Sequence, residues 1–116
     1  MGCVRELLER EGWTVRDVSA TESYDFDCVR GREHRFVEVK GTRGDGHKVQ
    51  ITANELALTR EQPGECALFV VWGIACSGDD ALGYATRGGQ IHREEPWSPN
   101  DDRLQPTAYA YTTSRP

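Results

Sequence analysis

The sequence predicts an α/β domain with a central mixed sheet flanked by helices. Three features support this fold class: an amphipathic segment near the N-terminus, two extended segments joined by a short turn, and a continuous apolar run in mid-chain. The length of 116 residues suits one domain with one modest core. We therefore expect a single domain over residues 1–116, with its core in residues 3–73 and an irregular extension in residues 74–116.

The first part of the chain predicts one helix followed by strands. Val4, Leu7 and Leu8 form an apolar stripe with helical spacing, and Gly12 suits the end of that helix. Gly31 lies between two segments of alternating polarity, so these segments should form a hairpin. The elements predicted here are a helix at 3–11 and strands at 13–18, 24–30 and 34–41.

The middle of the chain predicts a second helix and a buried strand. Thr52 and Glu55 have the spacing of a capping box, which indicates a helix start, and Pro63 with Gly64 ends that helix. The run 66–72 is apolar throughout, as expected for a central strand covered on both faces. The remaining predictions are short strands at 48–52, 82–86 and 107–112 and a loop at 88–105.

Composition narrows the class of protein. A net charge of -5 argues against a protein that binds nucleic acid by bulk attraction, although a nuclease stays possible because bound divalent cations reverse the local charge. No run approaches the roughly 20 apolar residues of a membrane span. The four cysteines form no Cys-x-x-Cys pair, so we expect no zinc site. Free thiols without a secretion signal predict a cytoplasmic protein with no membrane partner.

Residues 35–42 carry the most distinctive pattern, because an acid and a base stand on a strand that is otherwise largely apolar. Side chains alternate between the two faces of a strand, so Glu38 and Lys40 share one face. Asp25 lies thirteen residues before Glu38, on the other strand of the hairpin, and paired strands lie about 5 Å apart. We therefore expect Asp25, Glu38 and Lys40 to converge.

Two carboxylates beside a lysine suit metal-dependent hydrolysis of a phosphodiester bond. A divalent ion polarises the phosphoryl oxygen and lowers the pKa of the attacking water. Mg²⁺ keeps several waters, so two carboxylates suffice. We expect Asp25 and Glu38 to hold Mg²⁺ or Mn²⁺, and Lys40 to orient the water or offset developing charge. Asp27 shares a face with Asp25 and is an alternative metal ligand. A chance Glu–Lys pair at an exposed strand end is the simplest alternative.

Polar and basic residues beyond the third strand are candidates for contacts with nucleic acid. These candidates are Arg43, Lys48, Gln50 and Asn54. Asn54 opens the second helix, whose N-terminus can hold a phosphate, whereas its neighbour Glu55 is interpreted as a capping residue. Further basic residues at the hairpin are expected to extend a local positive patch: Arg30, Arg32 and Arg35.

The same residues carry a resemblance to a known family. The pattern is Tyr24-Asp25, a hairpin, Val-Glu-Val-Lys-Gly-Thr at 37–42, Ile-Thr-x-Asn-Glu at 51–55 and Leu-Phe-Val-Val at 68–71. It resembles the PD-(D/E)XK nuclease superfamily and, within it, the NO VEIN C-terminal-type domain. The resemblance implies a restriction-endonuclease-like αβββαβ core, with Asp25, Glu38 and Lys40 as the active-site trio. The chain departs from the superfamily at Tyr24, where proline often precedes the acid.

The sequence thus predicts a Mg²⁺-dependent endonuclease domain, with DNA favoured over RNA. The resemblance further implies a fused or associated helicase or ATPase, because such domains are often appended to these proteins, and it leaves a homodimer open. The competing interpretation is a catalytically inactive binding or docking module of a larger DNA-processing or defence protein. The acidic balance of the chain favours that alternative.

Overall fold

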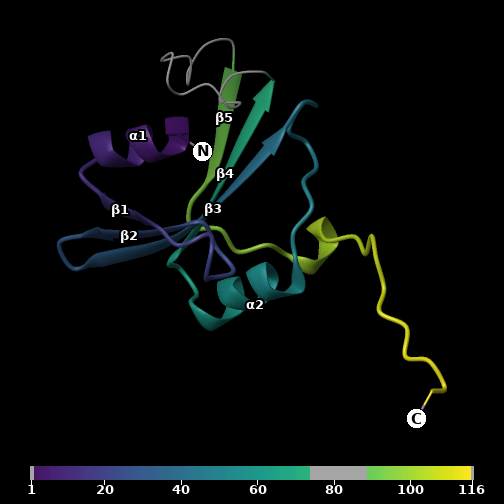
Figure 1. Ribbon diagram of the computed structural model, residues 1–116. Coiled ribbons are helices and arrows are strands. Elements are labelled where there is room, and N and C mark those ends of the chain that lie inside the picture. Colours follow the sequence, from purple (N-terminus) through teal and green to yellow (C-terminus); the bar gives the residue numbers. More distant parts are fainter. Residues whose placement is uncertain (1, 74–88, 116) are drawn as a thin grey trace.

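The computed structural model describes residues 2–73 and 89–115 and shows a five-stranded sheet with two α-helices (Figure 1). It confirms the predicted α/β class. The elements are α1 (Gly2–Arg10), β1 (Thr14–Asp17), β2 (Phe26–Arg30), β3 (Glu33–Thr42), α2 (Ala53–Glu61), β4 (Cys66–Gly73), β5 (Gly89–Glu94) and a 3-10 turn η2 (Asp101–Arg103). The order from α1 to β4 is the αβββαβ order that the resemblance implies. No helix in these two ranges combines the length and apolarity that a membrane crossing requires.

The sheet is mixed because β3 and β4 run parallel while the other neighbouring strands run antiparallel. The strand order is β1-β2-β3-β4-β5, and α2 connects the two parallel strands as a crossover helix. The parallel register places Glu38 beside Leu68 and Lys40 beside Val70. Both residues therefore lie where β3 is paired with β4 but beyond the end of its pairing with β2, which stops at Val37.

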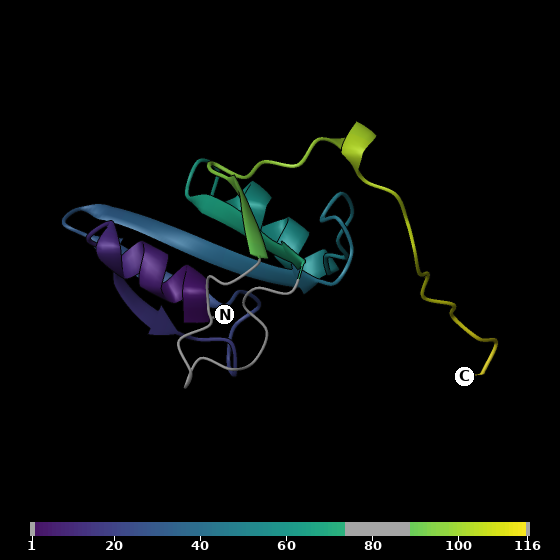
Figure 2. The ribbon, with the colours of Figure 1, turned by 90° about the horizontal axis from the view of Figure 1, so that it is seen from above.

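The two helices cover opposite faces of the sheet (Figure 2). The cluster on the α1 face consists of Cys3, Val4, Leu8, Trp13, Val15, Phe26, Cys28, Val37, Ala67, Phe69 and Val71. The cluster on the α2 face is smaller and consists of Cys66, Leu68, Val70 and Trp97, with Phe36, Val49, Ile51, Leu58 and Trp72 packed against it. β4 contributes to both clusters, as expected for a strand covered on both faces.

β3 alternates between these clusters. Val37 and Val39 pack on the α1 face, whereas Phe36 packs on the α2 face. Glu38 and Lys40 have the same parity as Phe36, so they share the α2 face, as predicted. The candidate catalytic residues therefore lie on the side of the sheet with the smaller apolar cluster.

Three predicted segments differ from the structure. Residues 48–52 form no strand, because Val49 and Ile51 pack onto the α2 face as irregular chain rather than pair with a neighbour. The loop predicted at 88–105 contains β5, whose backbone pairs with β4 although its sequence is mostly polar. Residues 107–112 are extended and exposed without strand pairing. The strand predicted at 82–86 lies outside the described residues.

The cysteines differ in state. Cys28 and Cys66 are free and buried, and burial raises the pKa of Cys28 to about 12 and that of Cys66 to about 11. Both therefore stay neutral and pack as small apolar side chains. Cys3 is buried and disulfide-bonded. The expectation of free thiols thus holds for Cys28 and Cys66 and is wrong for Cys3.

Candidate active site

Asp25 is fixed to β3 on both sides of Glu38. Its backbone N–H donates to the carbonyl of Val37 at 3.0 Å, and its Oδ2 accepts the N–H of Val39 at 2.8 Å. The carboxylate thus replaces a strand hydrogen bond just before β2 begins. The structure therefore brings Asp25 beside Glu38, as the predicted hairpin requires.

Glu38 is buried at an energetic cost. Its side chain lies on the α2 face, the residue is 6% exposed, and its Oε2 atom is buried with no hydrogen-bond partner among the described residues. Burial, followed by the neighbouring carboxyl of Asp25 and the charge of Glu55, raises the pKa of Glu38 far above its ordinary value, and Lys40 offsets only part of this. An unsatisfied buried polar group costs on the order of 1–3 kcal/mol. Such perturbed groups concentrate at functional sites.

Lys40 lies between two carboxyl groups. Its Nζ atom is 2.9 and 3.1 Å from the two oxygens of Glu55 but 3.9 Å from Oε1 of Glu38. Its closer partner therefore comes from α2 and not from its own strand. Asp25, Glu38, Lys40 and Glu55 are called the Lys40 cluster below. This cluster has three carboxyl groups for one ammonium group.

Glu55 has a second role that the sequence analysis missed. It caps α2 as predicted, because its Oε1 accepts the N–H of Thr52 at 2.8 Å and Thr52 Oγ1 accepts the N–H of Glu55 at 3.1 Å. Burial acts to raise the pKa of Glu55, but the hydrogen bonds from Thr52 and Lys40 outweigh it, so the pKa is lowered. The capping box was the signal for the position of Glu55, but its contact with Lys40 depends on how α2 packs across the sheet.

A narrow crevice opens beside the Lys40 cluster. Tyr24, Leu58 and Trp97 line it together with Glu38 and Glu55. Its volume of about 10 Å³ is near the minimum for one water molecule. Trp97 is buried here, and its backbone N–H donates to the backbone carbonyl of Cys66 at 2.7 Å. The segment after β5 therefore forms part of the wall of the site.

Asp27, the alternative ligand, is directed elsewhere. Its Oδ2 accepts a hydrogen bond from Arg16 at 2.8 Å, and its Oδ1 contacts the imidazole Nε2 of His34. In the sheet it pairs with Phe36, so it lies beyond Asp25 along the hairpin. The structure thus brings Asp25, and not Asp27, into the Lys40 cluster.

The four candidate nucleic-acid contacts are exposed and follow β3. They are Arg43, Lys48, Gln50 and Asn54. The loop that carries the first three lies close to Trp72: Gly46 has φ +76°, and a Cβ there would lie 2.8 Å from the Trp72 ring. Lys48 Nζ is 3.5 Å from the Gln105 side chain. A glycine at position 46 therefore allows the loop to lie against β4.

The expected single positive patch does not form. β3 has ten residues, so its ends lie about 30 Å apart. Arg30 and Arg32 lie at the hairpin end, whereas Arg43 and Lys48 lie beyond the other end. Arg35 faces α1 with Val37 and not the face of Lys40. The prediction that these residues cluster was wrong because it ignored the length and alternation of the strand.

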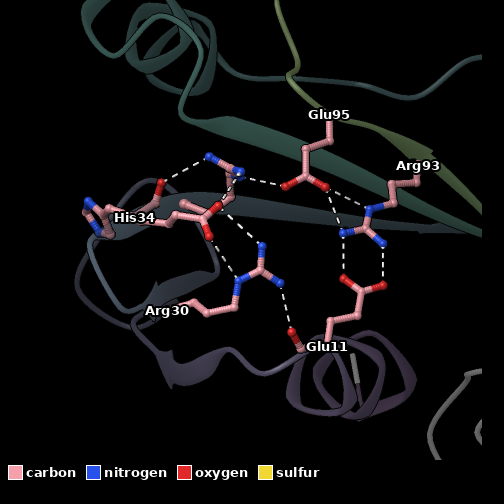
Figure 3. Close-up of polar contacts among 7 residues, drawn as sticks. Glu11, Arg30, His34, Arg93 and Glu95 are labelled. Carbon is pink, nitrogen blue, oxygen red and sulfur yellow. Dashed lines mark hydrogen bonds and ion pairs between the residues drawn. The ribbon is translucent and has the colours of Figure 1, made fainter.

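Two of the hairpin arginines, Arg30 and Arg35, instead join an ion-pair network on the α1 side (Figure 3). Arg93 from β5 binds both oxygens of Glu11 at 2.7 Å and also pairs with Glu95. Arg35 binds the other oxygen of Glu95 at 2.6 Å, and Arg30 donates to the backbone carbonyl of Glu11 at 2.8 Å. The group called the arginine network below is Glu11, Arg30, Glu33, Arg35, Arg93 and Glu95.

The arginine network is balanced in charge. It holds three guanidinium groups and three carboxylates, and the guanidinium groups of Arg30 and Arg35 lie 4.2 and 5.2 Å from the ring centre of Trp13. The network borders an open recess of about 290 Å³. Because each arginine already has a carboxylate partner, this recess does not present unpaired positive charge. The network connects β3 and β5 to the end of α1, so we interpret its role as structural.

Within the Lys40 cluster, only a divalent cation that takes few protein ligands could be held. Across residues 2–73 and 89–115, no three His, Cys, Asp or Glu side chains are arranged as a metal-binding group. Mg²⁺ commonly uses one or two carboxylates and keeps several waters. The buried Glu38 oxygen, which has no hydrogen-bond partner among the described residues, is an atom that such an ion could contact. Asp25 and Glu38 are therefore the residues that could hold an ion here.

The chain matches a known protein family. The family described as Protein NO VEIN, C-terminal, matches the chain over residues 1–83. That range contains α1 to β4 and the whole Lys40 cluster. No curated protein and no solved structure matches the chain.

Proposed function

The chain belongs to the NO VEIN C-terminal family, and from its Lys40 cluster we propose that it is a metal-dependent nuclease domain of restriction-endonuclease-like fold. The proposed reaction is endonucleolytic hydrolysis of phosphodiester bonds with Mg²⁺ or Mn²⁺, with DNA as the favoured substrate. The observation that supports it most is Oε2 of Glu38, which is buried next to the carboxyl of Asp25 and has no hydrogen-bond partner within residues 2–73 and 89–115. A buried carboxylate oxygen of this kind suits a divalent cation.

Three side chains have distinct roles in the proposed reaction. Asp25 and Glu38 would hold the cation, which when bound would polarise the phosphoryl group and lower the pKa of a water molecule. Glu38 must lose its proton to act as a ligand, so binding at this raised-pKa group releases a proton. Lys40 orients the attacking water or offsets charge that develops on the phosphoryl oxygens.

The proposed substrate contacts and partners follow from the same placement. Arg43, Lys48, Gln50 and Asn54 are exposed beyond β3 and would contact the nucleic-acid backbone. The two carboxylate oxygens of Asp27 are engaged by Arg16 and His34, so Asp25 is the first ligand and Asp27 at most a second one. A fused or associated helicase or ATPase, a homodimer and a cytoplasmic location complete the proposal.

Cleavage assays on plasmid and single-stranded DNA test the reaction. We expect metal-dependent cleavage by the wild type and a loss of at least about 100-fold in Lys40→Ala. Arg10→Ala is a suitable control, because Arg10 is exposed on α1 and pairs only loosely with Glu6 at 3.8 Å. Equal cleavage by the wild type and Lys40→Ala would contradict the proposal, as would no cleavage of either substrate with Mg²⁺ or Mn²⁺.

The second candidate function is a binding or docking module without turnover. The net charge of -5 favours it, since an acidic chain gains little from bulk attraction to nucleic acid. Such a module needs no cation at Glu38. Calorimetry that shows no Mn²⁺ affinity that Glu38→Ala removes, in a chain that does not cleave DNA, would favour this alternative.

A further inference from the structure

We propose that Glu55 is the positioning residue for Lys40: its carboxylate holds the ammonium group beside Glu38 and connects β3 to the first turn of α2. The catalytic consequence of this role rests on the proposed function. The positioning itself follows from contacts between side chains and is open to a test that needs neither metal nor substrate.

The geometry of Glu55 exceeds what a capping residue needs. A capping box uses one carboxylate oxygen to accept the N–H of the residue at the N-cap, here Thr52. The other oxygen of an ordinary capping glutamate faces water. Here the side chain of Glu55 is only 11% exposed, and both of its oxygens contact Lys40 Nζ. The side chain therefore binds the helix start and the strand at the same time.

The alternative anchor for Lys40 is more distant. Glu38 lies two residues away on the same face, yet its oxygen is 3.9 Å from Lys40 Nζ, beyond hydrogen-bond distance. A lysine side chain has four rotatable bonds and samples many conformations when it is not held. Without the Glu55 carboxylate, the ammonium group has no hydrogen-bonded partner among its described contacts. The position of Lys40 beside Glu38 thus depends on α2.

The chain offers a clean chemical test, because Lys40 and Lys48 are its only lysines. Reductive methylation with formaldehyde and a borohydride, followed by peptide mass spectrometry, gives the reaction rate of each lysine in the metal-free protein. Lys48 is exposed and serves as the internal reference, whereas the side chain of Lys40 is 21% exposed and hydrogen-bonded. We expect Lys40 to react more slowly than Lys48 in the wild type.

Two substitutions separate positioning from capping. Glu55→Gln keeps an oxygen for the N–H of Thr52 but removes the charge that holds Lys40, so the rate at Lys40 should rise severalfold while the rate at Lys48 is unchanged. Thr52→Ala removes the other half of the capping box and leaves Glu55 beside Lys40, so it should destabilise α2 without raising the rate at Lys40. A Glu55→Gln rate equal to that of the wild type overturns the proposal. An equal rise in Thr52→Ala also overturns it.

Kinetics give the second readout. In Glu55→Gln we expect kcat for DNA cleavage to fall about tenfold with KM nearly unchanged, because Lys40 acts on the transition state and not on substrate binding. A higher KM with an unchanged kcat would contradict a positioning role. If the wild type does not cleave DNA, the nuclease proposal fails, but the methylation rates still decide whether Glu55 positions Lys40.

Discussion

The arginine network and the Lys40 cluster differ in how well their positive and negative charges are matched. The arginine network pairs three guanidinium groups with three carboxylates on the α1 side of the sheet. The Lys40 cluster gathers three carboxyl groups around one ammonium group on the α2 side. The arginine network is balanced, whereas the Lys40 cluster carries an excess of negative charge close to a buried oxygen that has no partner in the described part of the chain.

The pKa directions follow this difference. In the arginine network, the hydrogen bond from Arg93 lowers the pKa of Glu11, and that from Arg30 lowers the pKa of Glu33. In the Lys40 cluster, burial and the neighbouring carboxyl of Asp25 raise the pKa of Glu38. A matched network stabilises its charged forms, whereas an unmatched one costs stability until another cation enters. The comparison therefore supports a structural role for the arginine network and is consistent with the proposed cation site in the Lys40 cluster.

The largest expected effect comes from Asp25→Asn. The amide keeps an oxygen to accept the N–H of Val39, so the hairpin should remain folded, but one anionic ligand is lost. We expect metal-dependent cleavage to fall at least about 100-fold with a nearly unchanged melting temperature. Cleavage assays and thermal unfolding of the same preparation measure both quantities. A melting temperature that falls together with activity would instead make Asp25 a structural residue.

A smaller effect, on stability alone, is expected from Arg93→Ala. This change leaves Glu11 without its bidentate partner and Glu95 with Arg35 alone, so the free energy of unfolding should fall by about 2 kcal/mol. Denaturant unfolding measures the loss. Arg60→Ala is the control, because it breaks only an exposed pair with Asp101 and should cost less than about 1 kcal/mol. Equal losses in the two variants would show that the arginine network is not structural.

A third effect concerns the pH dependence of stability. The pKa of Glu38 is raised from 4.5 to about 9 on folding, so between these pH values the folded protein retains a proton that the unfolded chain has released. The free energy of unfolding of the metal-free protein should therefore fall as the pH rises through this window. Glu38→Gln removes this slope and should be more stable than the wild type at pH 8. Parallel pH profiles for the two proteins would contradict the unmatched state of Glu38.

Much of the Lys40 cluster was predictable from local rules. Strand alternation placed Glu38 and Lys40 on one face, and the hairpin placed Asp25 beside Glu38. The capping box located Glu55 at the start of α2. Its contact with Lys40 was not predictable, because it depends on the crossover that lays α2 over β3.

The arginine network was not predictable for a related reason. Arg93 meets Glu11 across 82 positions of sequence, and Arg35 meets Glu95 across 60. β5 also lacks the apolar alternation that marks a strand. Its pairing with β4 uses backbone hydrogen bonds, which a pattern of side chains does not report. Sequence patterns report local periodicity, whereas long-range ion pairs and polar edge strands are fixed by the assembled sheet.

Calorimetric titration with Mn²⁺ at neutral pH tests the central claim most directly. We predict binding of one ion to the wild type with release of a proton, seen as a heat that varies with the ionisation enthalpy of the buffer. Glu38→Gln should lose this binding, and the exposed-residue variant Arg10→Ala should retain it. Absence of Mn²⁺ binding in the wild type, or equal affinity in Glu38→Gln, would contradict a cation site at Asp25 and Glu38.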